Sequence, residues 1–322
     1  MKNLRYLLVL LVFVSCKKEE QIKETKLQGG VFGTMYHITY LDDVNYQESI
    51  DSLFQLVNKS LSTYMPTSDI SKINQGDSTI VVDAMFEEVF QKSKRIFKET
   101  NGYFDPTVCE LVNAWGFGYK KEKKDLDSLQ VKELMKLVGF NKIELKDKKV
   151  VKQFSEMCLD FNSIAKGYGS DVVGRFLESK NVSNYLVEIG GEIRARGKNK
   201  RNKFWTVAID DPNTDGTRSV SRYVELDNQS MAGSGNYRKF RMTKDGRKVV
   251  HTISPKTGFA TESNLLSATV YGKVDCADVD AYATSFMAMG LEKSKAFLEK
   301  HPEIKAVLLY ANDKGEIEEF KN

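Results

Sequence analysis

Leu159-Asp-Phe-Asn-Ser-Ile-Ala-Lys-Gly-Tyr-Gly-Ser-Asp-Val-Val-Gly174 is the stretch around which the rest of the chain is organised. Residues 150–158 before it are mostly apolar and indicate a strand. Apolar residues at helical spacing follow it at 172, 173, 176 and 177. A strand that leads an acid and a lysine into a glycine-rich helix start is a common way to bind phosphate, because free N–H groups and the helix dipole favour an anion. Gly167 and Gly169 have a second interpretation, which is close packing of the helix on its neighbours.

The composition is that of an ordinary globular protein. Of the 322 residues, 41% are hydrophobic and 29% are charged, and the net charge of +4 is small. Lysines and glutamates are interspersed, so the basic excess indicates a solvated surface rather than a nucleic-acid-binding stripe. We therefore expect no nucleic-acid partner.

Strands and helices come in clusters rather than in strict alternation. Helices are predicted near 45–57 and 83–101, at 128–138, up to about 180 after the opening stretch, and at 278–289 and 291–300. Strands are predicted at 31–41, 185–189, 205–209, 223–226, 240–243, 248–253, 265–271 and 306–310. Lys244-Asp-Gly-Arg247 is typical of a hairpin turn. This pattern predicts an α+β fold with largely antiparallel sheets, as a single compact domain of two closely packed lobes.

The N-terminus has the pattern of an export signal. Lys2 and Arg5 precede an apolar run from Tyr6 to Val14, far short of the ~20 residues that span a bilayer. We expect a signal peptide over residues 1–15.

Cys16 follows a small residue at the end of that run, which resembles the bacterial lipoprotein box, where this cysteine is lipidated. A plain signal peptide with an incidental cysteine is the alternative. Residues 16–28 are charged and poor in apolar side chains, so we expect a flexible tether there and the folded domain at 29–322.

Cys109, Cys158 and Cys276 are widely spaced along the rest of the chain. We expect them to form neither a disulfide framework nor a zinc site. Cys158 lies in the apolar segment predicted as a strand and is expected to be a small core residue.

Asp280 and Thr284 form the most informative polar pair. At positions i and i+4 of a predicted helix they lie on one face. A carboxylate and a hydroxyl are hard oxygen ligands that suit Mg²⁺. The nearby Asp275 and Asp278 are expected to be N-capping residues of the same helix.

Other polar clusters are Tyr103-Phe104-Asp105, Asp160 with Ser163 and Lys166, and the segment that starts at His251. The chain lacks a Walker-type phosphate loop, a dinucleotide fingerprint and a G-x-S-x-G elbow. Its three histidines are too few for a histidine-rich metal site, and His37 and His301 are expected to be structural. His251 alone has a plausible chemical setting.

Seven short motifs follow one another in the chain. They are Phe32-Gly-Thr34, Leu61-Ser-Thr-Tyr64, Gly102-Tyr-Phe-Asp105, Leu159 to Gly167, Glu188-Ile-Gly-Gly191-Glu, His251 to Gly258 and Ala277 to Thr284. In this order they resemble the ApbE-like family of FAD:protein FMN transferases, over roughly Val31 to Tyr310. Each motif alone is weak, but seven in register are specific.

Members of that family are typically exported and often lipid-anchored. They use Mg²⁺ to split FAD and attach FMN through a phosphoester to a threonine or serine of a partner protein, with release of AMP. The resemblance implies that residues 29–322 are the catalytic domain. It implies that the FAD site is lined by Phe32, Tyr64, Tyr103, Phe104, Asp105, Asp160, Lys166 and Ile253. It also implies that Mg²⁺ is bound by Asp280, Thr284 and the carbonyl of Ser163. Ser163 and Asn162 replace the family's usual alanine and glycine.

In the expected reaction the acceptor hydroxyl attacks the FMN-side phosphorus while AMP leaves. Asp280 or His251 would take the proton as general base, and both remain open. Mg²⁺ and Lys166 would offset the charge that develops on the phosphate oxygens. Tyr64 and Tyr103 are expected to stack on the rings of FAD, with core packing as the alternative.

Two other functions fit the same residues. One is a Mg²⁺-dependent FAD pyrophosphatase that passes the phosphorus to water. The other is a flavin-binding lipoprotein without chemistry, which would not need Asp280 or Thr284. For the transferase we expect an acceptor protein, such as a subunit of a membrane redox complex, and a lipid anchor at Cys16 that holds the enzyme on a membrane facing the periplasm.

Overall fold

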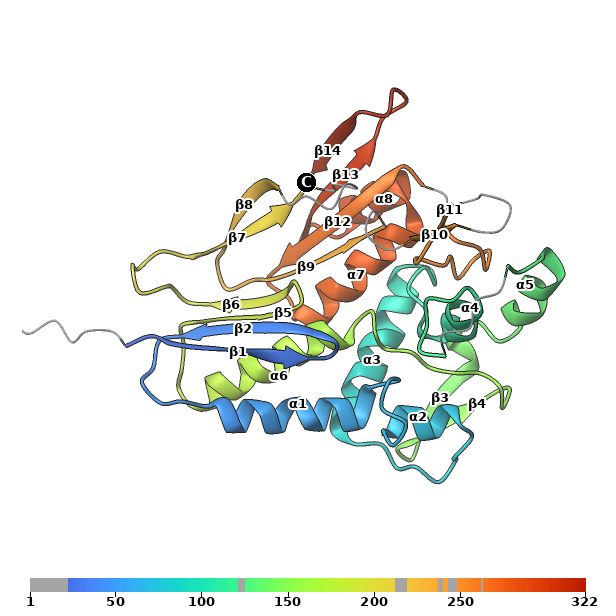
Figure 1. Ribbon diagram of the computed structural model, residues 1–322, viewed down its shortest axis with the longest axis horizontal. Coiled ribbons are helices and arrows are strands. Elements are labelled where there is room, and N and C mark those ends of the chain that lie inside the picture. The colour runs from blue at the N-terminus through green and yellow to red at the C-terminus, as the bar shows by residue number, and fades with distance from the viewer. Residues whose placement is uncertain (1–22, 121–124, 212–218, 237–239, 243–247, 262) are drawn as a thin grey trace, which may run out of the picture.

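The computed structural model describes residues 23–120, 125–211, 219–236, 240–242, 248–261 and 263–322. An antiparallel sheet of eight strands runs through it in the order β1-β2-β5-β6-β9-β12-β13-β14 (Figure 1). These strands are β1 (Thr25–Val31), β2 (Thr34–Tyr40), β5 (Tyr185–Ile189), β6 (Glu192–Arg196), β9 (Ser230–Gly235), β12 (Leu265–Gly272), β13 (Ile304–Ala311) and β14 (Ile317–Lys321). The predicted α+β class with antiparallel sheet is confirmed.

Among the described residues, three two-stranded pairs lie outside this sheet. They are β3 (Ile143–Lys146) with β4 (Lys149–Lys152), β7 (Trp205–Asp210) with β8 (Val220–Leu226), and β10 (Phe240–Met242) with β11 (Lys248–Val250). The predicted hairpin turn at 244–247 lies outside the described residues. The two strands that flank it pair antiparallel, as such a turn requires.

The helices are α1 (Gln47–Leu61), α2 (Asp69–Asn74), α3 (Ala84–Glu99), α4 (Cys109–Ala114), α5 (Ser128–Met135), α6 (Ala165–Ser179), α7 (Cys276–Met289) and α8 (Leu291–Lys300). The described part of the chain also contains two 3₁₀ turns, η1 (Pro106–Val108) and η2 (Phe140–Lys142). In Figure 1, α6 packs along β5 and β6, and α7 continues under β9 and β12. Within the described segments, none of these helices combines the length and the hydrophobicity that crossing a membrane requires.

Strand alternation gives the sheet two buried faces. In β13, Ala306 and Leu308 pack into the large core with the helices, whereas Val307 and Leu309 pack into a second cluster with Trp205 of β7. Successive side chains of a strand point to opposite faces, so one apolar run serves both cores. The sheet is therefore a middle layer between the helices and the β7–β8 pair.

Helix α7 is buried on nearly all sides, with Thr284 the one residue that is only half-buried. A helix that is apolar all round belongs inside a protein. Its small residues, among them Ala277 and Ala281, let α6 and the sheet approach closely. Two acids on such a helix, Asp278 and Asp280, therefore need partners or a function.

Three predicted boundaries are wrong. The tether expected at 16–28 ends earlier, because residues 25–28 already pair with residues 37–40 as part of β1. The strand expected at 150–158 stops at Lys152, since the backbone beyond it bonds to loops and not to a neighbouring strand. The helix expected at 128–138 ends at Met135, where 3₁₀-type bonds close its last turn.

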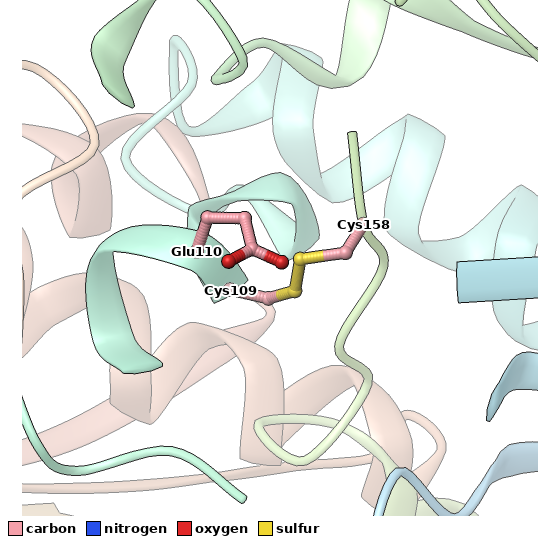
Figure 2. Close-up of side chains that lie close together, drawn as sticks. All are labelled: Cys109, Glu110 and Cys158. Carbon is pink, nitrogen blue, oxygen red and sulfur yellow. A yellow bond between two sulfur atoms is a disulfide. The ribbon is translucent and has the colours of Figure 1, made fainter. Parts of the chain in front are cut away.

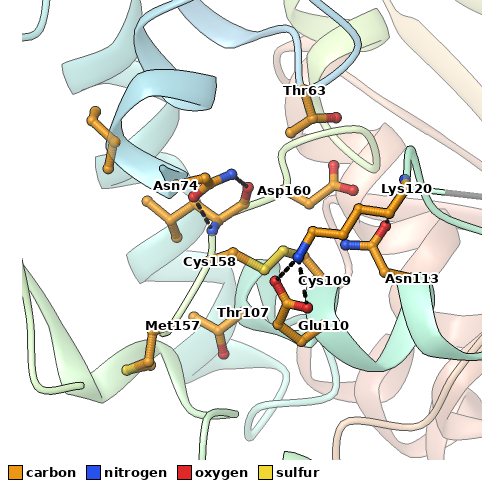
Figure 3. Close-up of a disulfide and its surroundings, with 12 residues drawn as sticks. Thr63, Asn74, Thr107, Cys109, Glu110, Asn113, Lys120, Met157, Cys158 and Asp160 are labelled. Atoms are coloured by element: carbon orange, nitrogen blue, oxygen red, sulfur yellow. Dashed lines mark hydrogen bonds and ion pairs between the residues drawn. A yellow bond between two sulfur atoms is a disulfide. The ribbon is translucent and has the colours of Figure 1, made fainter. Parts of the chain in front are cut away.

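The expectation that the cysteines form no disulfide is also wrong. Cys109 at the start of α4 is bonded to Cys158, with 6.0 Å between the two Cα atoms (Figure 2). Figure 3 shows Asn74 beside the disulfide and the pairing of Lys120 with Glu110. The amide of Asn74 exchanges two hydrogen bonds with the backbone of Leu159. The disulfide thus ties the start of α4 to the segment that leads into Asp160.

Candidate active site

One large cavity collects all the residues that the sequence places in the site. Its volume is about 1530 Å³, above the usual range for sites of small ligands. Its lining includes Phe32, Tyr64, Tyr103, Phe104, Asp105, Asp160, Ser163, Lys166, His251, Ile253, Asp280 and Thr284. Cys16, the predicted lipidation site, lies outside the described residues. The lining residues of the cavity thus come from segments spread between Phe32 and Ala288.

The cavity wall is fixed where α6 meets α7. The N–H of Gly167 donates to Oδ2 of Asp280 at 3.0 Å. A Cβ on Gly167 would lie 2.4 Å from the carbonyl oxygen of Cys276, so only glycine allows this approach. The packing interpretation of Gly167 is confirmed, and the same contact orients Asp280.

Alanine at position 167 tests this junction. We expect Gly167→Ala to push α7 away from α6 and to lower the free energy of unfolding by about 1–3 kcal/mol, because the blocking atom belongs to the backbone. Gly30→Ala is the matched control, since the nearest atom to a Cβ there is 3.8 Å away. Urea unfolding of both variants measures the difference. Equal stability of Gly167→Ala and the wild type would contradict the close packing.

The N-terminus of α7 is capped from α6 and not by its own acids. Both oxygens of Asp171, which is fully buried, accept hydrogen bonds at 2.9 Å from the N–H groups of Cys276 and Ala277. The expected capping by Asp275 and Asp278 is wrong, because their carboxylates face cations instead.

Asp275 pairs with Lys92, Arg175 and Arg194, and Asp278 pairs with Lys92 and Arg95. These charges hold the start of α7 against its neighbours. Asp280 lies in the next turn of α7, so these ion pairs also fix its position in the cavity wall.

Asp280 carries the electrostatic signature of a functional carboxylate. It is 5% exposed, and burial raises its pKa against the opposing effects of Lys166 and of the Gly167 N–H. A buried acid in a cavity, close to a cation, is a candidate for chemistry. Thr284, four residues on, lines the same cavity.

The turn before α6 brings Asp160 and Ser163 to the cavity. Oδ1 of Asp160 accepts from the N–H of Asn162 at 2.8 Å and so shapes this turn. Burial raises the pKa of Asp160 to about 6 against that hydrogen bond. Ser163, half-buried in the turn, shares the cavity with Asp280 and Thr284.

A different group of potential ligand atoms lies at Cys109, Glu110 and Cys158 (Figure 2). Their ligand atoms lie within 4.8 Å of one another. The two sulfur atoms are bonded to each other, so they are not thiolates that could bind a metal. In the described part of the chain, the oxygen donors of the cavity are the better candidates for holding an ion.

Glu192 is a residue of the cavity that the sequence did not single out. It is 2% exposed, and its Oε2 lies 2.7 Å from Nζ of Lys166. Burial raises the pKa of Glu192, and Lys166 opposes this. The only sequence signal was the motif Gly190-Gly191-Glu192, whose glycines turn the chain from β5 into β6 with positive φ at both positions.

Aromatic side chains line the other part of the cavity. Tyr64 is 63% exposed, whereas Phe104 is buried. The ring of Tyr103 has the ammonium groups of Lys256 and Lys293 at 5.6 and 5.4 Å from its centroid. The exposed face of Tyr64 is free of the core, so the alternative of plain core packing does not apply to it.

Asp105 lines the cavity and also has a structural role. Its Oδ1 accepts from the N–H and the hydroxyl of Thr107, and its Oδ2 accepts from the N–H of Phe140. Burial raises the pKa of this carboxyl against those bonds. Asp105 therefore organises the wall next to Phe104, and its predicted contact with FAD stays a prediction.

His251 and Ile253 enter the cavity from the segment after β11. The imidazole of His251 lies edge-on to Phe117, with 6.4 Å between the ring centroids. Next to it, the hydroxyl of Thr252 donates to the side chain of Asn236 at 2.7 Å, which ties the segment to the end of β9. Both candidates for a general base, His251 and Asp280, thus line one cavity.

The model of the ApbE family matches residues 32–308. The chain belongs to the ApbE family. Among its relatives in this family, a protein of Haemophilus influenzae named FAD:protein FMN transferase is 36% identical over 320 residues, which are 95% of this chain and 91% of that protein. A Vibrio cholerae protein of the same name is 33% identical over 315 residues, or 95% of this chain and 92% of the relative.

Solved ApbE structures have the same fold. The flavin transferase ApbE from Vibrio cholerae superimposes with a TM-score of 0.83 at 32% identity, covering 93% of this chain and 97% of that one. The apo form of the Pseudomonas stutzeri flavinyl transferase ApbE gives 0.83 at 28% identity, covering 93% and 95%. The family resemblance inferred from seven motifs is confirmed.

Proposed function

We propose that this protein is an FAD:protein FMN transferase that moves FMN from FAD to a threonine or serine hydroxyl of an acceptor protein and releases AMP. One observation carries the proposal. Asp280, Thr284, Ser163 and Lys166 line the same cavity as a group of aromatic side chains, in a chain whose relatives bear that name. Oxygen donors and a cation next to stacking surfaces are what a reaction on the pyrophosphate of FAD needs.

The transfer exchanges one phosphorus–oxygen bond for another. The acceptor oxygen forms a bond to the FMN-side phosphorus, and the bond from that phosphorus to the bridging oxygen breaks, so the bridging oxygen leaves with AMP. The hydroxyl proton goes to Asp280 or to His251, which both line the cavity. Lys166 would bind the phosphate oxygens and offset their growing negative charge.

The donor set fits Mg²⁺. Asp280, Thr284 and the carbonyl of Ser163 would hold the ion, and all three residues line the cavity. Oδ2 of Asp280 accepts from Gly167, and Oδ1 has no hydrogen-bond donor among the described residues. When bound, Mg²⁺ would supply charge neutralisation at the pyrophosphate.

The aromatic part of the cavity suits the rings of FAD. Phe32 lies edge-on to Phe54, with 5.6 Å between centroids, so its ring is held in a defined orientation. Tyr64 and Tyr103 add surfaces on which adenine or isoalloxazine would stack. Ile253, in the segment after β11, would contribute an apolar contact to the bound FAD.

We also propose that the protein is exported and anchored by a lipid on Cys16, facing the periplasm. The short apolar run at Tyr6–Val14 and the cysteine after Ser15 support this. The disulfide between Cys109 and Cys158 supports it too, because disulfides persist mainly in oxidising compartments. Metabolic labelling with a radioactive fatty acid, compared between the wild type and Cys16→Ala, tests the anchor.

The function is tested by incubating the purified protein with FAD, Mg²⁺ and a candidate acceptor from a membrane redox complex. We expect AMP in solution and flavin fluorescence that stays on the acceptor after denaturation. An acceptor variant with alanine in place of the modified threonine is the control. AMP without covalent flavin would favour the pyrophosphatase, and neither product would favour a flavin-binding protein.

A further inference from the structure

Glu192 and Lys166 form the one ion pair within the cavity among the described residues. Glu192 begins β6 and is almost fully buried, whereas the Lys166 side chain keeps a third of its surface exposed. A buried carboxylate needs a charged or hydrogen-bonding partner, and Lys166 at 2.7 Å supplies it. The pair joins α6 to β6 of the sheet, so the packing of these two elements fixes the side of Lys166 on which Glu192 lies.

Lys166 interacts with a second carboxylate as well. Burial lowers the pKa of Lys166, but the charges of Glu192 and then Asp280 outweigh this and raise it. Asp280 belongs to the same buried group, with its Oδ2 bonded to the N–H next to Lys166 in sequence. The ammonium therefore has two acids within electrostatic range and makes its close contact with one of them.

We propose that Glu192 is a positioning residue that holds the Lys166 ammonium away from Asp280 and so keeps the Asp280 carboxylate available to a divalent cation. This inference rests on the proposed function, since it takes Asp280 as the acid that holds Mg²⁺. It assigns to Glu192 no contact with substrate.

Charge balance gives the reason. Burial raises the pKa of Glu192 to about 8, so both acids are ionised only in mildly alkaline solution. One ammonium and two carboxylates then leave one negative charge, which belongs to Asp280. Without Glu192, the flexible four-carbon stem of Lys166 lets its ammonium move to the remaining acid. A cation would then have to displace an ammonium from a buried pair, where attraction is strong because screening is weak.

The test is the affinity of the FAD-free protein for Mg²⁺, measured by calorimetric titration at mildly alkaline pH. We expect Glu192→Gln to weaken Mg²⁺ binding about tenfold or more, the usual effect of losing a residue that orients a ligand. In a Lys166→Met background the same substitution should have no effect, because no ammonium remains to compete. The melting temperature of each variant shows whether folding changed.

The double-mutant comparison separates three accounts. Equal weakening by Glu192→Gln in both backgrounds would overturn the proposal and would mean that Glu192 acts directly on the cation. Unchanged Mg²⁺ affinity in the single variant Glu192→Gln would overturn it as well. Asp280→Asn is the reference for the site: if it binds Mg²⁺ as tightly as the wild type, the proposed metal site fails and not only the part given to Glu192.

Discussion

Replacing Asp280 with asparagine is expected to reduce FMN transfer at least about 100-fold while the protein stays folded. Asparagine keeps the shape and can still accept from the N–H of Gly167, so the change removes little but the charge. The negative charge is what Asp280 would need to bind a divalent cation or to take the proton from the acceptor hydroxyl. Covalent flavin on the acceptor, measured by in-gel fluorescence over time, gives the rate.

Stability should move in the opposite direction from activity. Because burial raises the pKa of Asp280, the ionised carboxylate is less stable in the folded protein than in the unfolded chain at neutral pH. Asp280→Asn removes that unfavourable charge, so its melting temperature should equal or exceed that of the wild type. Functional groups are often kept at such a cost in stability.

Asp278→Asn is the matched control on the same helix. Asp278 does not line the cavity, and it pairs with Lys92 at 3.1 Å and with Arg95 at 2.8 Å. This variant should lose stability but keep most of its transfer rate while it is folded, because the three cations that pair with Asp275 still hold the start of α7. If Asp280→Asn kept full activity, or if both variants lost it equally, the place of Asp280 in the mechanism would be wrong.

The sequence predicts local features of the site well. The spacing of Asp280 and Thr284 was enough to place both on one face of a helix, and both do line the cavity. The helix predicted from residue 83 also begins there, since Asp83 accepts from the N–H of Phe86 as the N-cap of α3. Such features depend on neighbours within one turn.

Contacts between distant segments could not be predicted in this way. The cap of α7 comes from Asp171, about a hundred residues earlier, and Glu192 meets Lys166 only because β6 lies beside α6. Nothing in the spacing of Cys109 and Cys158 indicates that their Cα atoms approach to 6.0 Å. Partners of this kind are set by packing, which periodicity does not encode.

Removing the disulfide is expected to lower the free energy of unfolding by about 2–4 kcal/mol. The bond joins residues 49 positions apart, so it closes a long loop and restricts the unfolded chain. Urea unfolding of the oxidised protein, with and without a reducing agent, measures the loss. Cys109→Ser/Cys158→Ser should unfold at the same urea concentration as the reduced wild type.

The double variant also separates this bond from other effects of reduction. The reducing agent should not change its unfolding curve, because Cys276, the one free cysteine among the described residues, is buried and forms no disulfide that could be reduced. Transfer activity should persist at low temperature, since the N–H of Asp160 still bonds to the carbonyl of Pro106 at 2.9 Å and holds the two segments together. Two thiols that react with an alkylating agent at positions 109 and 158 in the untreated, denatured protein would contradict the disulfide.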